Sequence, residues 1–588
     1  MDSQEINFGG RDFFLRAWRP YLWLALIASL PYVHILSFSE YTFYDDHFLI
    51  VDSFSSIDEW SDAGHAFLED VSHQGQAGNL YRPLLTISLI LSAKISGTLP
   101  LGYHGMDILL HCISCCLLFS VLQKLGFKRL YSFFGTMIFC VHPAFTQAVA
   151  WIAGRNDSLL AIFILLSFIT FEKYYSTSSM KWYVLHLFCF ACALFTKESA
   201  LLLPLLAVWY SFRFRKEKTF YVSTLLFVAG WGIVLVNWNI LRSNAMIVPI
   251  GDKVHAAALV LSNLPIALSY LGNIFWPFDL AFGPIASDIH LTVGSICLGL
   301  LLLAVLFSER KDWKCIVFGV AWYMVFLIPT LYYNTGAHTP PKFYEHRIYL
   351  PSMGILFILL SLSYTNRLRY FKKIFFPILF LVFIFLGWSS YTRTFLFKNS
   401  LTLGEYDAST SPNDPRRYST ITRMALPEKL NQEIKKNKDR SPLQEESDTS
   451  VSKEELWKII DGLNQELTSN HQNPELHHAL AIACFARGLF LSSEEHFLAA
   501  IHEKPQDATI PYNLGILYYS AQPKSKAENA WLEALRIDST MGNAHLNISF
   551  LYYELGRYQL AWDHCQKALQ LGIAVPSGFI NEIHGKIS

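Results

Sequence analysis

The chain has 588 residues, of which 52% are hydrophobic and only 16% are charged, and its formal net charge at pH 7 is zero. Soluble proteins are closer to one-quarter charged, so the composition excludes an ordinary soluble enzyme. A zero net charge gives no sign of nucleic-acid binding. The apolar residues lie mostly before residue 395, which predicts one membrane domain followed by one water-exposed domain.

Long apolar runs predict about eleven membrane spans, with the N-terminus in the cytoplasm. Every strongly basic short loop falls on the cytoplasmic side in this count, as the positive-inside rule requires. The runs cover residues 21–38, 101–122, 130–150, 158–175, 182–195, 199–210, 220–241, 291–307, 317–333, 348–364 and 374–391. Two further apolar stretches, 81–97 and 254–277, would reverse every later loop if they crossed. We predict that they form interfacial or re-entrant helices on the outer face.

The loop after the first span carries two adjacent carboxylates, Asp45 and Asp46. Residues 39–80 hold nine acidic side chains and no Lys or Arg. Ionisable groups close to a bilayer are costly unless they are paired or functional. A solvated acidic loop is the alternative explanation, because outer loops need few basic residues.

Other polar side chains fall near the same predicted membrane surface. They are Arg82, His104, Asp107, His142, Arg155, Asp157, Lys197, Glu198, Glu345 and Arg347. Each alone has an ordinary structural explanation, since Arg and Lys snorkel and a single His is usually hydrogen bonded. Together they are expected to surround one outward-facing cavity that suits an anionic lipid headgroup and a polar acceptor. The His residues lack the tight spacing of a metal site.

The composition changes after the last predicted span. Residues 396–472 are predicted to be a linker and helical connection, rich in polar residues and Pro. A period of 34 residues follows, with copies starting at Pro474, Ala508 and Gly542. The order of small and large residues in the three copies is typical of tetratricopeptide helix pairs, which stack into an α-solenoid with a concave surface. We therefore predict a peptide-binding repeat domain over 473–588.

Several short motifs occur in a characteristic order along the chain. They are Tyr44-Asp45-Asp46-His47, Tyr81-Arg82-Pro83-Leu84, residues 103–111, His142-Pro143 and the residues to 150, Gly154-Arg155-Asn156-Asp157, Thr196-Lys197-Glu198, and residues 345–352. In these motifs the chain resembles the transmembrane and tetratricopeptide-repeat O-mannosyltransferase-like proteins of the GT-C glycosyltransferase superfamily. It departs from them at Asp107, where family members usually carry Asn, and at Gln147, where they often carry Glu.

The resemblance implies an all-α protein, with a GT-C-like polytopic helix bundle over 1–395. It also implies inverting transfer of a sugar, mannose by the family's name, from a polyprenyl-phosphate donor to a hydroxyl of a protein or other acceptor on the outer or luminal face. Asp45 and Asp46 would be catalytic, one of them as the general base. The cations expected to bind the donor phosphate are Arg82, Arg155, Lys197 and Arg347. Supporting roles fall to His104, Asp107, His142, Asp157, Glu198 and Glu345.

No cofactor is required by these features, and a divalent metal ion is left open. Two other functions are considered: a non-catalytic membrane scaffold with a peptide-binding repeat domain, and a transporter of lipid-linked sugars. A scaffold does not need an acidic pair beside several cations, and a transporter places ionisable residues near mid-membrane. These points favour the enzyme. We expect a bacterial inner membrane with the repeats in the periplasm, the alternative being an endoplasmic reticulum membrane with the repeats in the lumen.

Overall fold

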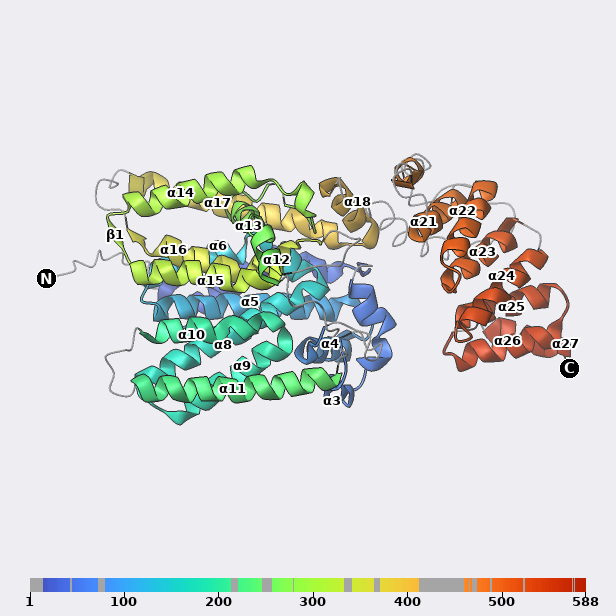
Figure 1. Cartoon of the computed structure of the whole chain (residues 1–588), viewed down its shortest axis with the longest axis horizontal. Helices are drawn as coiled ribbons and strands as arrows, with labels where there is room; N and C mark the ends of the chain where they lie inside the picture. The colour runs from blue at the N-terminus through green and yellow to red at the C-terminus, as the bar shows by residue number, and fades with distance from the viewer. Residues whose placement is uncertain are drawn as a thin grey trace. The chain divides into compact units, whose positions relative to one another are not determined.

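The computed structural model divides the chain into two units, Met1–Asp414 and Pro415–Ser588. It describes residues 14–42, 45–71, 80–212, 220–245, 256–278, 280–332, 341–363, 371–411, 459–464, 466–467, 473–486, 489–521, 524–573, 575 and 577–587. The described parts of both units are built from α-helices, as Figure 1 shows. This confirms the predicted all-α class.

The first unit is a helix bundle whose elements follow the predicted apolar runs. Its helices are α2 (Arg19–Ser29), α3 (Asp62–His65), α4 (Pro83–Ser96), α5 (Pro100–Lys124), α6 (Arg129–Cys140), α7 (Thr146–Ala150), α8 (Arg155–Thr177), α9 (Met180–Thr196), α10 (Leu203–Ser211), α11 (Phe220–Ala245), α12 (Ala256–Asn263), α13 (Ile266–Phe275), α14 (Leu291–Phe307), α15 (Trp313–Leu331), α16 (Tyr349–Leu360), α17 (Phe371–Thr394) and α18 (Ser400–Thr410).

Among the described residues, five helices are long and apolar enough to cross a membrane, or six if the bent pair Arg129–Cys140 and Pro143–Ala150 is one span. The predicted number of eleven is larger because several apolar runs form short or broken helices. The first run, for example, stops as an α-helix at Ser29 and resumes as the 3-10 turn Val33–Ser37. The count of eleven stays a prediction.

Loops that were predicted to share the cytoplasmic side meet at one end of the bundle. Strand β1 (Arg310–Lys311) pairs antiparallel with β2 (Leu362–Ser363), an element that the sequence did not predict. At the other end lie α3 and α4, and Arg82 directly precedes α4 (Figure 1). The bundle therefore has two chemically different ends.

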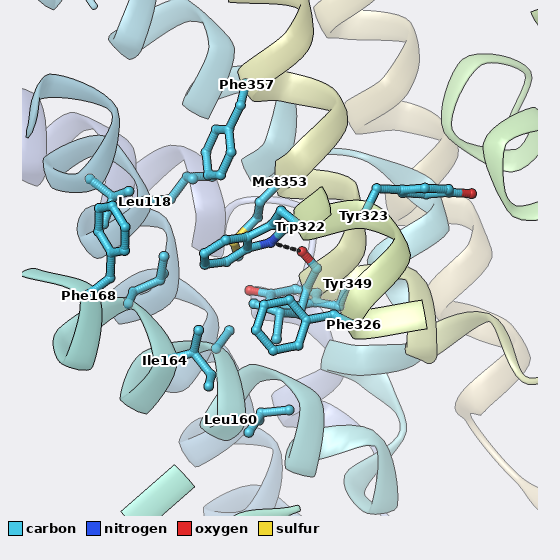
Figure 2. Packing of buried hydrophobic residues seen from close by; sticks show 14 of the residues in the cluster. Leu118, Leu160, Ile164, Phe168, Trp322, Tyr323, Phe326, Tyr349, Met353 and Phe357 are labelled. Carbon is cyan, nitrogen blue, oxygen red and sulfur yellow. Dashed lines mark hydrogen bonds between the residues drawn. The ribbon is translucent and has the colours of Figure 1, made fainter. Parts of the chain in front are cut away.

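A large aromatic and aliphatic core joins α5, α8, α15 and α16, and Figure 2 shows Trp322 at its centre. Trp322 is fully buried, and its indole nitrogen donates to the backbone oxygen of Leu350 at 2.9 Å. Helices α15 and α16 touch through Gly319 and Gly354. A Cβ at Gly319 would lie 2.5 Å from the carbonyl oxygen of Gly354, so only glycine allows this approach. This packing fixes the turn at 345–348 that precedes α16.

Helix α18 packs on the first unit, which thus extends past the predicted domain boundary at 395. The buried Lys342 ammonium lies 2.5 Å from a carboxylate oxygen of Asp407 in α18. Tyr406 donates a hydrogen bond to the backbone oxygen of Leu280. Most of the predicted linker, 412–458, lies outside the described residues.

This packing predicts where the chain can be shortened. A chain ending at Asp414 should keep the thermal unfolding midpoint of the first unit. A chain ending at Phe395 should unfold several degrees lower, because Lys342 would stay buried without its carboxylate partner. Fluorescence-detected thermal unfolding in detergent would compare the two, and equal midpoints would mean that α18 adds nothing to the stability of the bundle.

The second unit consists of helix pairs and confirms the predicted repeats. The helices are α21 (Pro474–Ala486), α22 (Phe490–Glu503), α23 (Thr509–Ala521), α24 (Lys524–Ile537), α25 (Gly542–Glu554), α26 (Tyr558–Gln570) and α27 (Ser577–Ile587). Helices α22, α24 and α26 begin 34 residues apart. Contacts between neighbouring pairs repeat at the same interval: Tyr518 donates to Glu494 at 2.8 Å, and Tyr552 donates to Glu528 at 3.0 Å. Each pair thus buries its apolar face against the next.

Candidate active site

The acidic pair lies in a helical turn that leads into the π-helical segment His47–Asp52. Asp46 is buried and held at both oxygens. It accepts hydrogen bonds from the Thr42 hydroxyl at 2.5 Å and from the Ala153 backbone nitrogen at 2.8 Å. Asp45, in contrast, is exposed. The two carboxylates therefore have different surroundings, and Asp45 is the one that a substrate can reach. The neighbouring Tyr44 lies outside the described residues.

Both carboxyl groups have a raised pKa, which favours their neutral form. Burial raises the pKa of Asp46 to about 7, although the hydrogen bonds from Thr42 and Ala153 oppose this shift. Desolvation by the surrounding protein raises the pKa of Asp45, while the nearby positive charge of Arg82 opposes this shift. A raised pKa makes Asp45 a stronger base near neutral pH.

Three of the four predicted cations gather around His346. Arg82 forms a 3.4 Å ion pair with Glu198, and both side chains remain partly exposed. Arg347 is partly buried, with its guanidinium 5.4 Å from the centre of the Tyr344 ring. The pKa of the buried His346 is lowered, first by desolvation and then by the charges of Lys197, Arg347 and Arg82. All three cations are therefore near one another.

Lys197 is tied to Asp157 at the N-terminus of α8. Its ammonium contacts the two carboxylate oxygens of Asp157 at 2.7 and 2.8 Å. Burial lowers the pKa of Lys197 to about 8; Asp157 opposes this shift, and the charges of Arg82 and Arg347 add to it. Nε2 of His346 lies 3.7 Å from the same Asp157 carboxylate. His346 lies inside one of the motifs that carry the family resemblance, but the sequence did not predict that it lies next to Asp157 and the cations.

The fourth predicted cation, Arg155, has a different environment from the one expected. It is fully buried, and its Nε lies 2.5 Å from a carboxylate oxygen of the fully buried Asp107. Its other nitrogens donate to the backbone oxygens of Ser88 and Tyr103 and to the hydroxyl of Ser92. With its donors used by the protein, Arg155 ties α4, α5 and α8 together and does not point at a substrate.

The remaining supporting residues are held in place by the backbone or by new partners. Both ring nitrogens of His142 are hydrogen bonded, to the Ala144 nitrogen and the Ile274 oxygen, so it is a structural histidine.

Buried Glu345 pairs with Arg393 of α17 at 2.5 Å, and burial raises the pKa of Glu345 to about 7. Buried His104 packs edge-on against Phe38. Arg393 was not predicted, because it follows an apolar run and has no motif of its own.

Gln147, one of the two departures from the family pattern, also has a defined role in the structure. It is fully buried, accepts from the His346 backbone nitrogen at 2.8 Å and donates to the Phe282 oxygen at 3.0 Å. Gln147 thus fixes the turn that carries Arg347. Within the segments that the structure describes, no group of three or more His, Cys, Asp or Glu side chains is arranged to hold a metal ion.

The fold and the site define the class: an all-α, multi-pass membrane protein with a tetratricopeptide-repeat unit. The curated proteins that it resembles are named protein O-mannosyl-transferases. They include mouse TMTC1 (31% identity over 149 residues), human TMTC2 (32% over 165 residues) and mouse TMTC4 (31% over 213 residues). The resemblance to this family is thereby confirmed.

These alignments cover 24%, 26% and 31% of this chain and only 15%, 20% and 28% of the relatives. The chain is thus aligned with less than one-third of each relative's length. No family model matches the chain. Among solved structures, MamA has 16% sequence identity and a TM-score of 0.23, and the match covers 32% of this chain and 93% of MamA. The Thermus thermophilus repeat protein TTC0263 has 16% identity and a TM-score of 0.24, and the match covers 32% of this chain and 89% of that protein.

Proposed function

We propose that the protein transfers a sugar, mannose, from a polyprenyl-phosphate donor to a hydroxyl group of a protein acceptor. The observation that carries this proposal is an exposed carboxylate, Asp45, close enough to Arg82 to feel its charge. Arg82 in turn belongs to a cluster of three cations with Lys197 and Arg347. The names of the similar proteins support the same reaction. The site would face the outer or luminal side, because it lies at the bundle end opposite the basic loops.

The reaction needs a base at the acceptor. Asp45 takes the proton of the acceptor hydroxyl while its oxygen attacks the anomeric carbon from the side opposite the phosphate, so the configuration inverts. Asp46 does not take part directly. Its bonds to Thr42 and Ala153 hold the turn that presents Asp45.

The reaction also needs charge stabilisation at the leaving group. The bond between the anomeric carbon and the phosphate oxygen breaks, and its electron pair stays on the lipid phosphate. Arg82 and Arg347 can each clasp two phosphate oxygens, and Lys197 supplies a point charge. We assign Arg155 to positioning, because its ion pair with Asp107 supports α8, which carries Asp157 and through it Lys197.

The repeat unit would hold the acceptor polypeptide, since stacked helix pairs present a concave surface. Chemistry would belong to the first unit. The full chain should therefore have a lower KM for a peptide acceptor than a chain ending at Asp414.

The direct experiment is to incubate the purified protein with polyprenyl-phosphate mannose and a Ser/Thr-containing peptide, and to measure donor consumption and mannosylated peptide. Consumption by the wild type and none by Asp45→Asn would support the proposal. A wild type that consumes no donor with any peptide, while still binding peptides through its repeats, would instead support the membrane scaffold.

The lowered pKa of Lys197 predicts how donor use depends on pH. Lys197 loses its charge as the pH rises through about 8, so the apparent KM for the donor should increase above that pH. Lys197→Arg keeps its charge, because guanidinium has a pKa above about 12. The KM of this variant should therefore stay flat between pH 7 and 9. The same rise in both proteins would show that Lys197 does not bind the phosphate.

A further inference from the structure

A cavity lies at the opposite end of the bundle from Asp45. It has a volume of about 950 Å³ and is bounded by the end of α5, the end of α10 and the start of α15. Helix α5 carries Asp107 near its start and is followed by Leu125 in the cavity wall. Because α5 has 25 residues, its two ends are about 37 Å apart. The cavity is thus separate from the candidate active site.

Aromatic rings form much of this cavity. Trp209 stacks on Phe318 with ring centres 5.4 Å apart and planes 9° from parallel. Trp313 and Phe212 are both more than half exposed at the ends of their helices. Trp and Tyr at helix ends are typical of the level of a bilayer where headgroups meet acyl chains. An amphipathic ligand would find an apolar surface here.

Two lysines give the cavity its charge. Lys311 lies with its ammonium 5.8 Å from the Trp313 ring centre and donates to the Leu306 backbone oxygen at 3.0 Å. Lys314 is exposed, and no carboxylate pairs with it within the described residues. The acid in the wall, Asp312, is occupied in capping α15, where it accepts from the backbone nitrogens of Lys314 and Cys315. Two lysines against one carboxylate give the wall a net positive charge, which favours a negatively charged group.

We propose that this cavity binds an anionic phospholipid, whose phosphate lies against Lys311 and Lys314 and whose glycerol and upper acyl chains lie on Trp209, Trp313 and Phe318. Basic pockets between helices at the cytoplasmic face are suited to acidic headgroups, and the cytoplasmic leaflet supplies such lipids. The loop 309–314 lies at the end of the bundle that the positive-inside rule assigns to that leaflet. The site does not depend on the proposed transferase activity.

Native mass spectrometry of the full-length protein in detergent tests the proposal. Phosphatidylglycerol should bind the wild type about tenfold more tightly than phosphatidylcholine, and K311Q/K314Q should remove that preference. The matched control is K173Q/K181Q, which neutralises two lysines beside Trp182 outside the cavity. The control should keep the preference. Equal preference in K311Q/K314Q and the wild type would overturn the proposal.

Two further measurements keep the result interpretable. K314Q alone removes an exposed charge that makes no described ion pair, so it should fold normally and reduce the preference about threefold. An unchanged preference in a folded K314Q would count against the site. Soluble glycerol phosphate separates a lipid from a free phosphate: it should fail to displace phosphatidylglycerol at millimolar concentration. Displacement at the concentration that lipid requires would assign the cavity to a soluble phosphate ligand instead.

Discussion

Replacing Asp45 by Asn is expected to lower turnover by about 10²–10⁴-fold, the usual contribution of a positioned general base. The amide has nearly the same size but cannot take the acceptor proton. Since Asp45 is exposed, the thermal unfolding midpoint should not change. Donor binding should also be retained, because the cations proposed to bind the phosphate are untouched. The measurement is mannosyl transfer to peptide alongside donor affinity for the same protein preparation.

The matched control is Glu40→Gln, which removes another exposed acid from the same loop and should leave turnover unchanged. Asp46→Asn should behave differently from both. Asp46 is buried between Thr42 and Ala153, so this variant should lower the unfolding midpoint together with turnover. Normal turnover in Asp45→Asn would remove the base from this position and with it the proposed mechanism.

The pH profile provides a second readout for the same residue. A carboxyl group acts as a base only when ionised, and the pKa of Asp45 is raised by the surrounding protein. Activity of the wild type should therefore fall as the pH drops through this raised value, at a higher pH than for an ordinary Asp. The residual activity of Asp45→Asn should lack that acidic limb. An identical acidic limb in both proteins would assign it to another group, such as Glu345.

Much of the architecture was predictable because it depends on local patterns. Apolar runs identified the helices of the bundle in order, and the 34-residue period identified the repeat pairs. The placement of the basic loops separated the two ends of the bundle, and β1–β2 pairing agrees with two of those loops sharing one end. Each of these inferences uses only neighbours along the chain.

The environment of each polar side chain could not be predicted in the same way. Arg155 and Asp107 are far apart in sequence and meet only because α5 and α8 pack together. Hydropathy does not tell which of two adjacent acids, Asp45 or Asp46, turns inward. The docking of α18 includes the buried ion pair between Lys342 and Asp407, which no sequence pattern marks. Such partners follow from tertiary packing, which the sequence motifs do not encode individually.

Replacing Asp107 by Ala should destabilise the first unit by about 3–5 kcal/mol, the usual cost of leaving a buried charge without its partner. Arg155 would keep its bonds to Ser88, Ser92 and Tyr103 but would lose the carboxylate at its Nε. Reversible unfolding in mixtures of dodecyl sulfate and a mild detergent would measure the change. Glu172→Ala is the control, because its ion pair with Lys124 is partly exposed and should be worth less than about 1 kcal/mol.

Two more variants separate charge from shape. Asp107→Asn keeps a hydrogen-bond acceptor for Arg155, so the loss of stability should be smaller than for Ala. The double variant Arg155→Met/Asp107→Leu removes both charges and should recover much of the stability lost in Asp107→Ala. It should still lower turnover, because α8 would no longer be held by Arg155 near Lys197. Equal unfolding energies for Asp107→Ala and Glu172→Ala would show that the Arg155 pair does not support the bundle.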